Sequence, residues 1–156
     1  MKNLAFLPVL IILGLLQCAF WDYFRIFNIG ADLLFAAVII AGLCMDLKWA
    51  VLIGLCAGII KDSLLLGSFG MNTFMFTLWG FLIAQISRKI SIEDNFRRIC
   101  FSLIAALIQN ILCAALLYNS GSVVPVGIAL RVIFVGSIYT ALTSPLIFKI
   151  IEKCQG

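Results

Sequence analysis

Histidine is missing from this sequence, and charged residues make up only 12% of its 156 positions. A soluble domain has about 25% charged residues, so this chain lacks the polar surface that would cover a soluble core. Apolar residues reach 64%, and the mean hydropathy is +1.20. These values exclude a soluble enzyme, a disordered chain and a basic nucleic-acid binder. They leave a polytopic helical membrane protein.

Groups for catalysis or metal binding are also scarce. Without histidine there is no Ser–His or Cys–His pair to activate a nucleophile. The six cysteines include no C-x-x-C spacing, and packing as small polarizable residues is their simplest role. Glu93 and Asp94 lie together in a basic segment and are expected to be solvated. We therefore predict no enzyme activity, no cofactor and no metal site.

Six apolar segments follow one another along the chain, and a spanning helix needs about 20 such residues. The N-terminal segment resembles a signal peptide, but the rest of the chain is equally apolar, so we interpret it as the first spanning helix. Residues 21–30 are aromatic and mixed in charge, which is typical of an interfacial segment. The predicted fold is all-α, a single transmembrane domain over residues 1–156 with about six helices at 4–20, 31–45, 49–66, 71–86, 99–118 and 125–151.

Short polar or small-residue breaks separate these helices. Residues 46–49 are predicted as a tight turn that joins the second and third helices in a hairpin. Residues 67–70 are predicted as the turn before the fourth helix, because a glycine at each end permits a positive φ. Within the third helix, Gly54 and Gly58 form a G-x-x-x-G spacing that permits close backbone approach. Pro145 is expected to kink the last helix near its end.

The cations are distributed unequally between the two sides that six crossings would create. With both termini on one side, that side holds eight lysines and arginines and the other holds three. Cytoplasmic loops carry the excess of positive charge in membrane proteins, so we predict that both termini are cytoplasmic. The eight are Lys2, Lys48, Arg88, Lys89, Arg97, Arg98, Lys149 and Lys153, and the three are Arg25, Lys61 and Arg131.

Four ionisable residues fall within or at the edge of predicted spanning helices, where a charge costs a few kcal/mol or more. Asp62 and Arg131 lie at similar depth, counted at ~1.5 Å per residue. We predict an ion pair between them, with separate contacts to lipid headgroups as the alternative. Lys61 is expected to reach the headgroups by itself. Asp32 either caps the second helix or forms an ion pair, and the sequence leaves both roles open.

Four short motifs stand in order between residues 31 and 84. They are Ala31-Asp32-Leu33-Leu34 at a helix start, the run from Gly54 and Gly58 to Asp62, the turn from Gly67 to Gly70 followed by Asn72, and Gly80-Phe81-Leu82. This arrangement resembles the rod shape-determining protein MreD family, whose pattern is a P-D-L-L-like helix start, a G-x-x-x-D helix end, L-G-x-N-like residues and a G-Y-L-like segment. The chain departs from it at Ala31, Phe69 and Phe81, which replace Pro, Leu and Tyr.

The resemblance implies a non-enzymatic scaffold subunit of the machinery that elongates rod-shaped bacteria, located in the cytoplasmic (inner) membrane. Proteins of this family associate with the membrane-anchored protein MreC. Through it they join MreB filaments and the cell-wall synthase pair of RodA and a class B penicillin-binding protein. The residues that we expect to support the fold or contact a partner are Asp32, Gly54, Gly58, Asp62, Gly67, Gly70, Asn72, Gly80 and Arg131.

The resemblance also supplies an alternative, because the family fold is similar to that of the S-components of energy-coupling-factor vitamin transporters. A small-molecule-binding transporter subunit is therefore the second hypothesis. The predicted outer loops are short and hold no convergent polar groups that would cover a ligand, which favours the scaffold. A lipid-modifying membrane enzyme is a third hypothesis, and the sequence offers no candidate catalytic residues for it.

Overall fold

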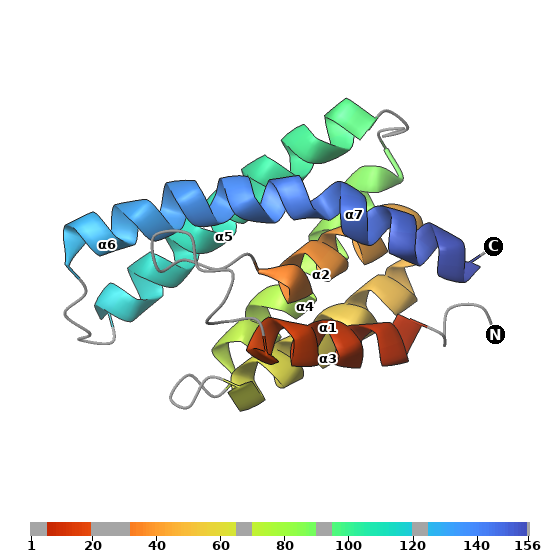
Figure 1. Ribbon diagram of the computed structural model, residues 1–156, viewed down its shortest axis with the longest axis horizontal. Helices are drawn as coiled ribbons and strands as arrows, with labels where there is room; N and C mark the ends of the chain where they lie inside the picture. Colours follow the sequence, from red (N-terminus) through yellow and green to blue (C-terminus); the bar gives the residue numbers. More distant parts are fainter. Residues whose placement is uncertain (1–5, 20–31, 65–69, 90–94, 120–124, 156) are drawn as a thin grey trace.

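All regular structure in the computed structural model is helical over the residues that it describes, which are 6–19, 32–64, 70–89, 95–119 and 125–155. The helices are joined end to end along the chain, and α6, the π-helical turn and α7 run on as one rod (Figure 1). The predicted all-α class is confirmed. The helices are α1 (Phe6–Ala19), α2 (Leu33–Cys44), α3 (Leu47–Leu64), α4 (Met71–Ser87), α5 (Asn95–Asn119), α6 (Val126–Arg131) and α7 (Ser137–Gln155), with a π-helical turn at Val132–Gly136 between the last two.

Two predicted polar breaks are shorter than the sequence indicated. Helix α3 begins at Leu47, so residues 46–49 do not form a separate turn. Helix α5 begins at Asn95, so Arg97 and Arg98 belong to the helix and not to the preceding loop. A helix satisfies its own backbone hydrogen bonds and can continue past an apolar stretch, while long cationic side chains extend away from it. Polarity alone therefore misplaced both starts.

Helix α2 lies at the centre of the molecule (Figure 1), with contacts to α1, α3, α4, α5 and α7. It has only 12 residues, and the nine from Leu34 to Gly42 are all buried. A helix that is apolar on every side is stable only when other helices cover it completely. The short length and uniform hydrophobicity of α2 are thus explained by its central position.

The closest packing in the described structure joins α3 to α4, and glycine makes it possible. A methyl group at Gly58 would lie 2.8 Å from the backbone nitrogen of Thr73. One at Gly54 would lie 2.9 Å from the carbonyl carbon of Phe76, and Gly80 packs in the same way against the α3 backbone. Because these neighbours are main-chain atoms, they cannot move aside as a flexible side chain would. We call α2, α3 and α4 the central block.

Helix α5 and the continuous rod of α6, the π-helical turn and α7 lie side by side and extend beyond the central block (Figure 1). We call this pair the two-helix arm. Its segments Phe96–Leu116 and Gly127–Lys149 are long and apolar enough to cross a membrane, whereas Pro8–Gln17 and Leu33–Cys44 are shorter apolar helices. Large apolar side chains are exposed along the arm, among them Phe96, Ile104, Ile111, Phe134, Leu142 and Leu146.

Candidate functional site

The carboxylate of Asp62 caps the beginning of helix α4. Its two oxygens accept hydrogen bonds from the backbone nitrogens of Gly70 (3.0 Å), Asn72 (3.2 Å) and Thr73 (2.9 Å). They also accept from Asn72 Nδ2 (2.9 Å) and Thr73 Oγ1 (2.6 Å). The first backbone N–H groups of a helix have no partner within the helix, and a negative charge there is favourable. Asp62, which is only 4% exposed, supplies that partner from the end of α3.

The predicted ion pair between Asp62 and Arg131 is wrong. Arg131 lies in α6 with an exposed side chain, in the two-helix arm. The depth argument placed the two residues at similar levels but did not identify the nearest donors to the carboxylate. Those donors are Gly70 and the first residues of α4, only eight to eleven residues later in the chain, so the carboxylate is satisfied locally.

Gly70 occupies the position before helix α4 with a left-handed backbone, φ = +88°. An L-residue with a side chain is strained at this φ, and a β-branched residue most of all. Nothing lies within 4 Å of a methyl group built at Gly70, so the requirement for glycine is conformational and not steric. Gly67, at the other end of the predicted turn, lies outside the residues that the structure describes.

Asp32 fills both of the roles that the sequence left open, one with each oxygen. Oδ1 accepts a hydrogen bond from the backbone nitrogen of Phe35 (3.1 Å) and caps helix α2. Oδ2 forms an ion pair with Lys61 of α3. The side chains of Lys61 and Asp32 are 16% and 21% exposed, and the Lys61 ammonium lies 4.8 Å from the centre of the Phe76 ring. The prediction that Lys61 reaches the headgroups by itself is therefore wrong.

Two polar residues that the sequence analysis did not select complete the start of α2. The side-chain oxygen of Gln17 in α1 accepts from the backbone nitrogen of Leu34 (3.2 Å). Thr140 Oγ1 in α7 accepts from the backbone nitrogen of Asp32 (3.2 Å) and donates to the carbonyl of Gly136 (2.8 Å). Both side chains are buried. A polar residue within an apolar helix can be recognised in the sequence as a candidate for a structural or functional role, but the sequence does not show which group it binds.

Two side-chain amides, the buried Gln109 and the half-buried Asn110, connect α5 to its neighbours. The indole nitrogen of Trp79 in α4 donates to Gln109 Oε1 at 2.6 Å, which links the central block to the arm. Asn110 Nδ2 donates to Ser137 Oγ at 3.0 Å, beside the π-helical turn. Such a turn widens the helix locally and leaves backbone carbonyls for other donors. These contacts fix the orientation of α5 against α4 and α7.

The two capped helix starts are built for holding helices together. Asp32 accepts from one helix N–H and pairs with Lys61, and Asp62 accepts from three backbone N–H groups and two side chains, so both carboxylates join a helix start to a neighbouring element. No group of three or more metal-ligating side chains occurs within the described residues. Four helices, α1, α2, α3 and α7, meet through hydrogen bonds at the start of α2, and α3 meets α4 through Asp62. This joint is the candidate functional site.

The motifs of the sequence analysis thus have a structural explanation. Asp32 and Asp62 are the caps, and Gly54, Gly58 and Gly80 make the close contacts. Gly70 precedes α4 and Asn72 lies in its first turn, where both donate to Asp62. No curated protein and no solved structure matches the chain. A family model described as rod shape-determining protein MreD matches residues 2–153, nearly the whole length. The chain therefore belongs to the MreD family, whose proteins are membrane proteins with a role in determining rod shape.

Proposed function

We propose that this protein is a non-enzymatic scaffold subunit of the bacterial cell-elongation complex. In this proposal it binds an MreC-like protein in the cytoplasmic membrane and links it to MreB-like filaments and to a RodA and penicillin-binding protein pair. The family membership supports a role in rod shape. The observation that carries the scaffold is the use of both carboxylates, Asp32 and Asp62, as helix caps. Because these carboxylates hold the helices together, they support a rigid surface for partners.

We further propose six membrane crossings with both termini in the cytoplasm. Of the predicted cytoplasmic cations, Lys48, Arg88, Lys89, Arg97, Arg98 and Lys149 stand at one set of helix ends, because α3 and α5 begin there and α4 and the apolar part of α7 end there. Lys61 and Arg131 stand at the opposite helix ends. The positive-inside rule supports the cytoplasm for the first set. Cysteines introduced at 119–124 should react with an impermeant reagent added outside intact cells, and reaction only after cell opening would reverse the orientation.

The scaffold is tested at the turn before α4, where one position accepts a matched pair of substitutions. Gly70→Val places a β-branched residue at φ = +88° and should distort the turn that Asp62 binds, whereas Gly70→Asn suits a left-handed backbone. We expect rod-shaped cells that carry only the Val variant to become round and the MreC-like partner to disappear from pull-downs. Cells with the Asn variant should stay rod-shaped at equal protein level.

A different set of results would replace the proposal. If depletion of the protein leaves cell shape unchanged but stops uptake of a vitamin or metal ion, the protein is a transporter subunit like an S-component. Recovery of the tagged protein with a pair of ATPases, and without an MreC-like protein, would lead to the same conclusion. If both Gly70 variants keep the partner equally, the partner surface does not depend on this turn.

A further inference from the structure

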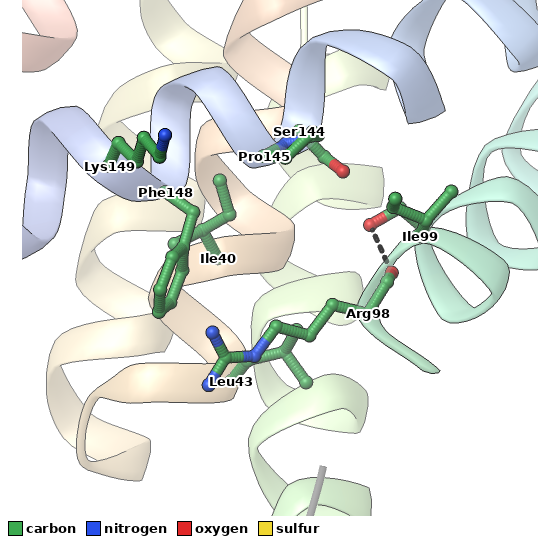
Figure 2. Close-up of a pocket in the computed structure, with 9 residues that line it drawn as sticks. Ile40, Leu43, Arg98, Ile99, Ser144, Pro145, Phe148 and Lys149 are labelled. Atoms are coloured by element: carbon green, nitrogen blue, oxygen red, sulfur yellow. Dashed lines mark hydrogen bonds between the residues drawn. The ribbon is translucent and has the colours of Figure 1, made fainter. Parts of the chain in front are cut away.

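A cavity of about 390 Å³ lies between α2, α5 and α7 (Figure 2). This volume falls in the range of small-molecule sites, roughly 300–1,000 Å³. Its apolar wall is formed by Ile40 and Leu43 of α2 and by Phe148 of α7. Figure 2 shows Phe148 and Arg98 extending toward one another from α7 and α5 beside these two residues. The cavity is separate from the capped helix starts, because it lies near the opposite end of α2.

Besides the apolar side chains, two cations and two hydroxyl groups line the cavity. Arg98 and Lys149 both line the cavity, together with Ser102 and Ser144. The Arg98 guanidinium lies 3.9 Å from the centre of the Phe148 ring, a stacking contact that orients its planar set of N–H donors. None of the lining residues that the structure describes is acidic. The lining therefore suits an anion that carries an apolar group, and a guanidinium is well matched to phosphate.

The position of the cavity along the helices indicates where such a ligand comes from. Arg98 is two residues from the start of the apolar segment Phe96–Leu116, and Lys149 is the last residue of the segment Gly127–Lys149. Within the described residues, both cations thus stand near the ends of long apolar segments that can cross a membrane. This is the level of the lipid headgroups, where basic pockets between helices bind anionic lipids.

We propose that this cavity binds an anionic phospholipid, with its phosphate at Arg98 and Lys149 and its apolar part against Ile40, Leu43 and Phe148. Phosphate is the negative group that phospholipid headgroups share, and an anionic phospholipid carries no cation beside it that Arg98 and Lys149 would repel. The apolar wall accounts for the glycerol and upper acyl chain. A bound lipid would fill the space between the central block and the two-helix arm and fix their relative position. The site does not depend on any protein partner of the chain.

The test is native mass spectrometry of the full-length protein, purified in mild detergent and titrated with phosphatidylglycerol, phosphatidylcholine or inorganic phosphate. We expect resolved adducts of phosphatidylglycerol at lower concentration than of phosphatidylcholine. Arg98→Gln should weaken the phosphatidylglycerol affinity about fivefold, the effect of one cation near a lipid surface. Lys149→Gln, at an exposed position that tolerates substitution, should weaken it by a similar factor and keeps the test valid if Arg98→Gln does not fold.

The matched control is Lys89→Gln, which removes an exposed cation from the same end of the molecule but outside the cavity. Its phosphatidylglycerol affinity should equal that of the unchanged protein. Equal losses for Lys89→Gln and Arg98→Gln would mean diffuse surface attraction and would overturn the site. Equal affinity for the two lipids would also overturn it, and displacement of the lipid by inorganic phosphate would assign the cavity to a free anion instead.

Discussion

The central block and the two-helix arm solve the same problem, association of helices in an apolar environment, in different ways. In the central block, glycines bring the α3 and α4 backbones together, and two carboxylates cap the starts of α2 and α4. In the arm, α5 and α7 are long helices with many exposed apolar side chains and a few amide and hydroxyl contacts. The block is held by main-chain contacts, whereas the arm is held by side chains.

This difference determines which substitutions each region tolerates. A hydrogen bond from a buried backbone N–H has no replacement in an apolar interior, so losing its acceptor costs the full desolvation of the donor. When one apolar side chain replaces another at a lipid-exposed position, the protein loses little stability. We therefore expect substitutions that add or remove a few atoms to destabilise the central block. The arm should tolerate most substitutions of one apolar residue by another.

Removal of the Asp62 carboxylate should have the largest effect on stability. Asp62→Ala leaves three backbone N–H groups at the start of α4 without their acceptor, and at about 1 kcal/mol for each group the loss is about 3 kcal/mol. Unfolding of the purified protein by denaturing detergent measures it. The control is Asp46→Ala, because Asp46 is 82% exposed and lies 4.0 Å from Arg88. Its loss should stay below about 0.5 kcal/mol.

The same measurement separates the cap from the ion pair that the sequence suggested. Arg131→Gln should change stability by less than about 0.5 kcal/mol, as expected at an exposed site. Combined with Asp62→Asn, its effect should be additive, because the two side chains have no common partner. A non-additive result, or equal losses for Asp62→Ala and Asp46→Ala, would contradict the role of Asp62 as the cap of α4.

Addition of one methyl group distinguishes the two regions at matched positions. Gly58→Ala places a Cβ against the Thr73 backbone, 2.8 Å from its nitrogen, and should cost about 2 kcal/mol by overpacking. Gly127→Ala in α6 meets nothing within 4 Å and should be neutral or stabilise by up to about 1 kcal/mol. Thermal unfolding of the two variants in one detergent is the measurement. A destabilised Gly127→Ala together with an unchanged Gly58→Ala would reverse the comparison.

The ion pair between Asp32 and Lys61 should give a smaller effect. A double-mutant cycle with Asp32→Asn and Lys61→Met should yield a coupling free energy of about 1 kcal/mol, because both side chains are only partly exposed. Lys61→Met also removes the cation–π contact with Phe76, and the cycle subtracts that contribution, while Asp32→Asn keeps a side-chain oxygen that can cap α2. A coupling of zero would mean that Lys61 contacts lipid headgroups, as the sequence first indicated.

Much of the central block was accessible from its sequence, but the pairings were not. The G-x-x-x-G spacing of Gly54 and Gly58 and the glycine turn at Gly70 gave the right positions for close contact and positive φ. Asp62 was selected because a buried carboxylate needs a partner, and the partner that we predicted was wrong. Gln17 and Thr140 were not selected, since a single polar residue in an apolar helix has no spacing pattern to reveal its hydrogen bond.

The amino-acid sequence by itself determined that the chain is helical and membrane-like, because hydrophobicity and helical propensity are sums over neighbouring residues. It also determined the family, through short motifs in fixed order. Only the tertiary structure decided that Asp62 binds the start of α4 and that Asp32 divides its two oxygens between α2 and Lys61. A carboxylate accepts from whichever donors lie within about 3 Å, and that distance depends on how the helices pack against one another.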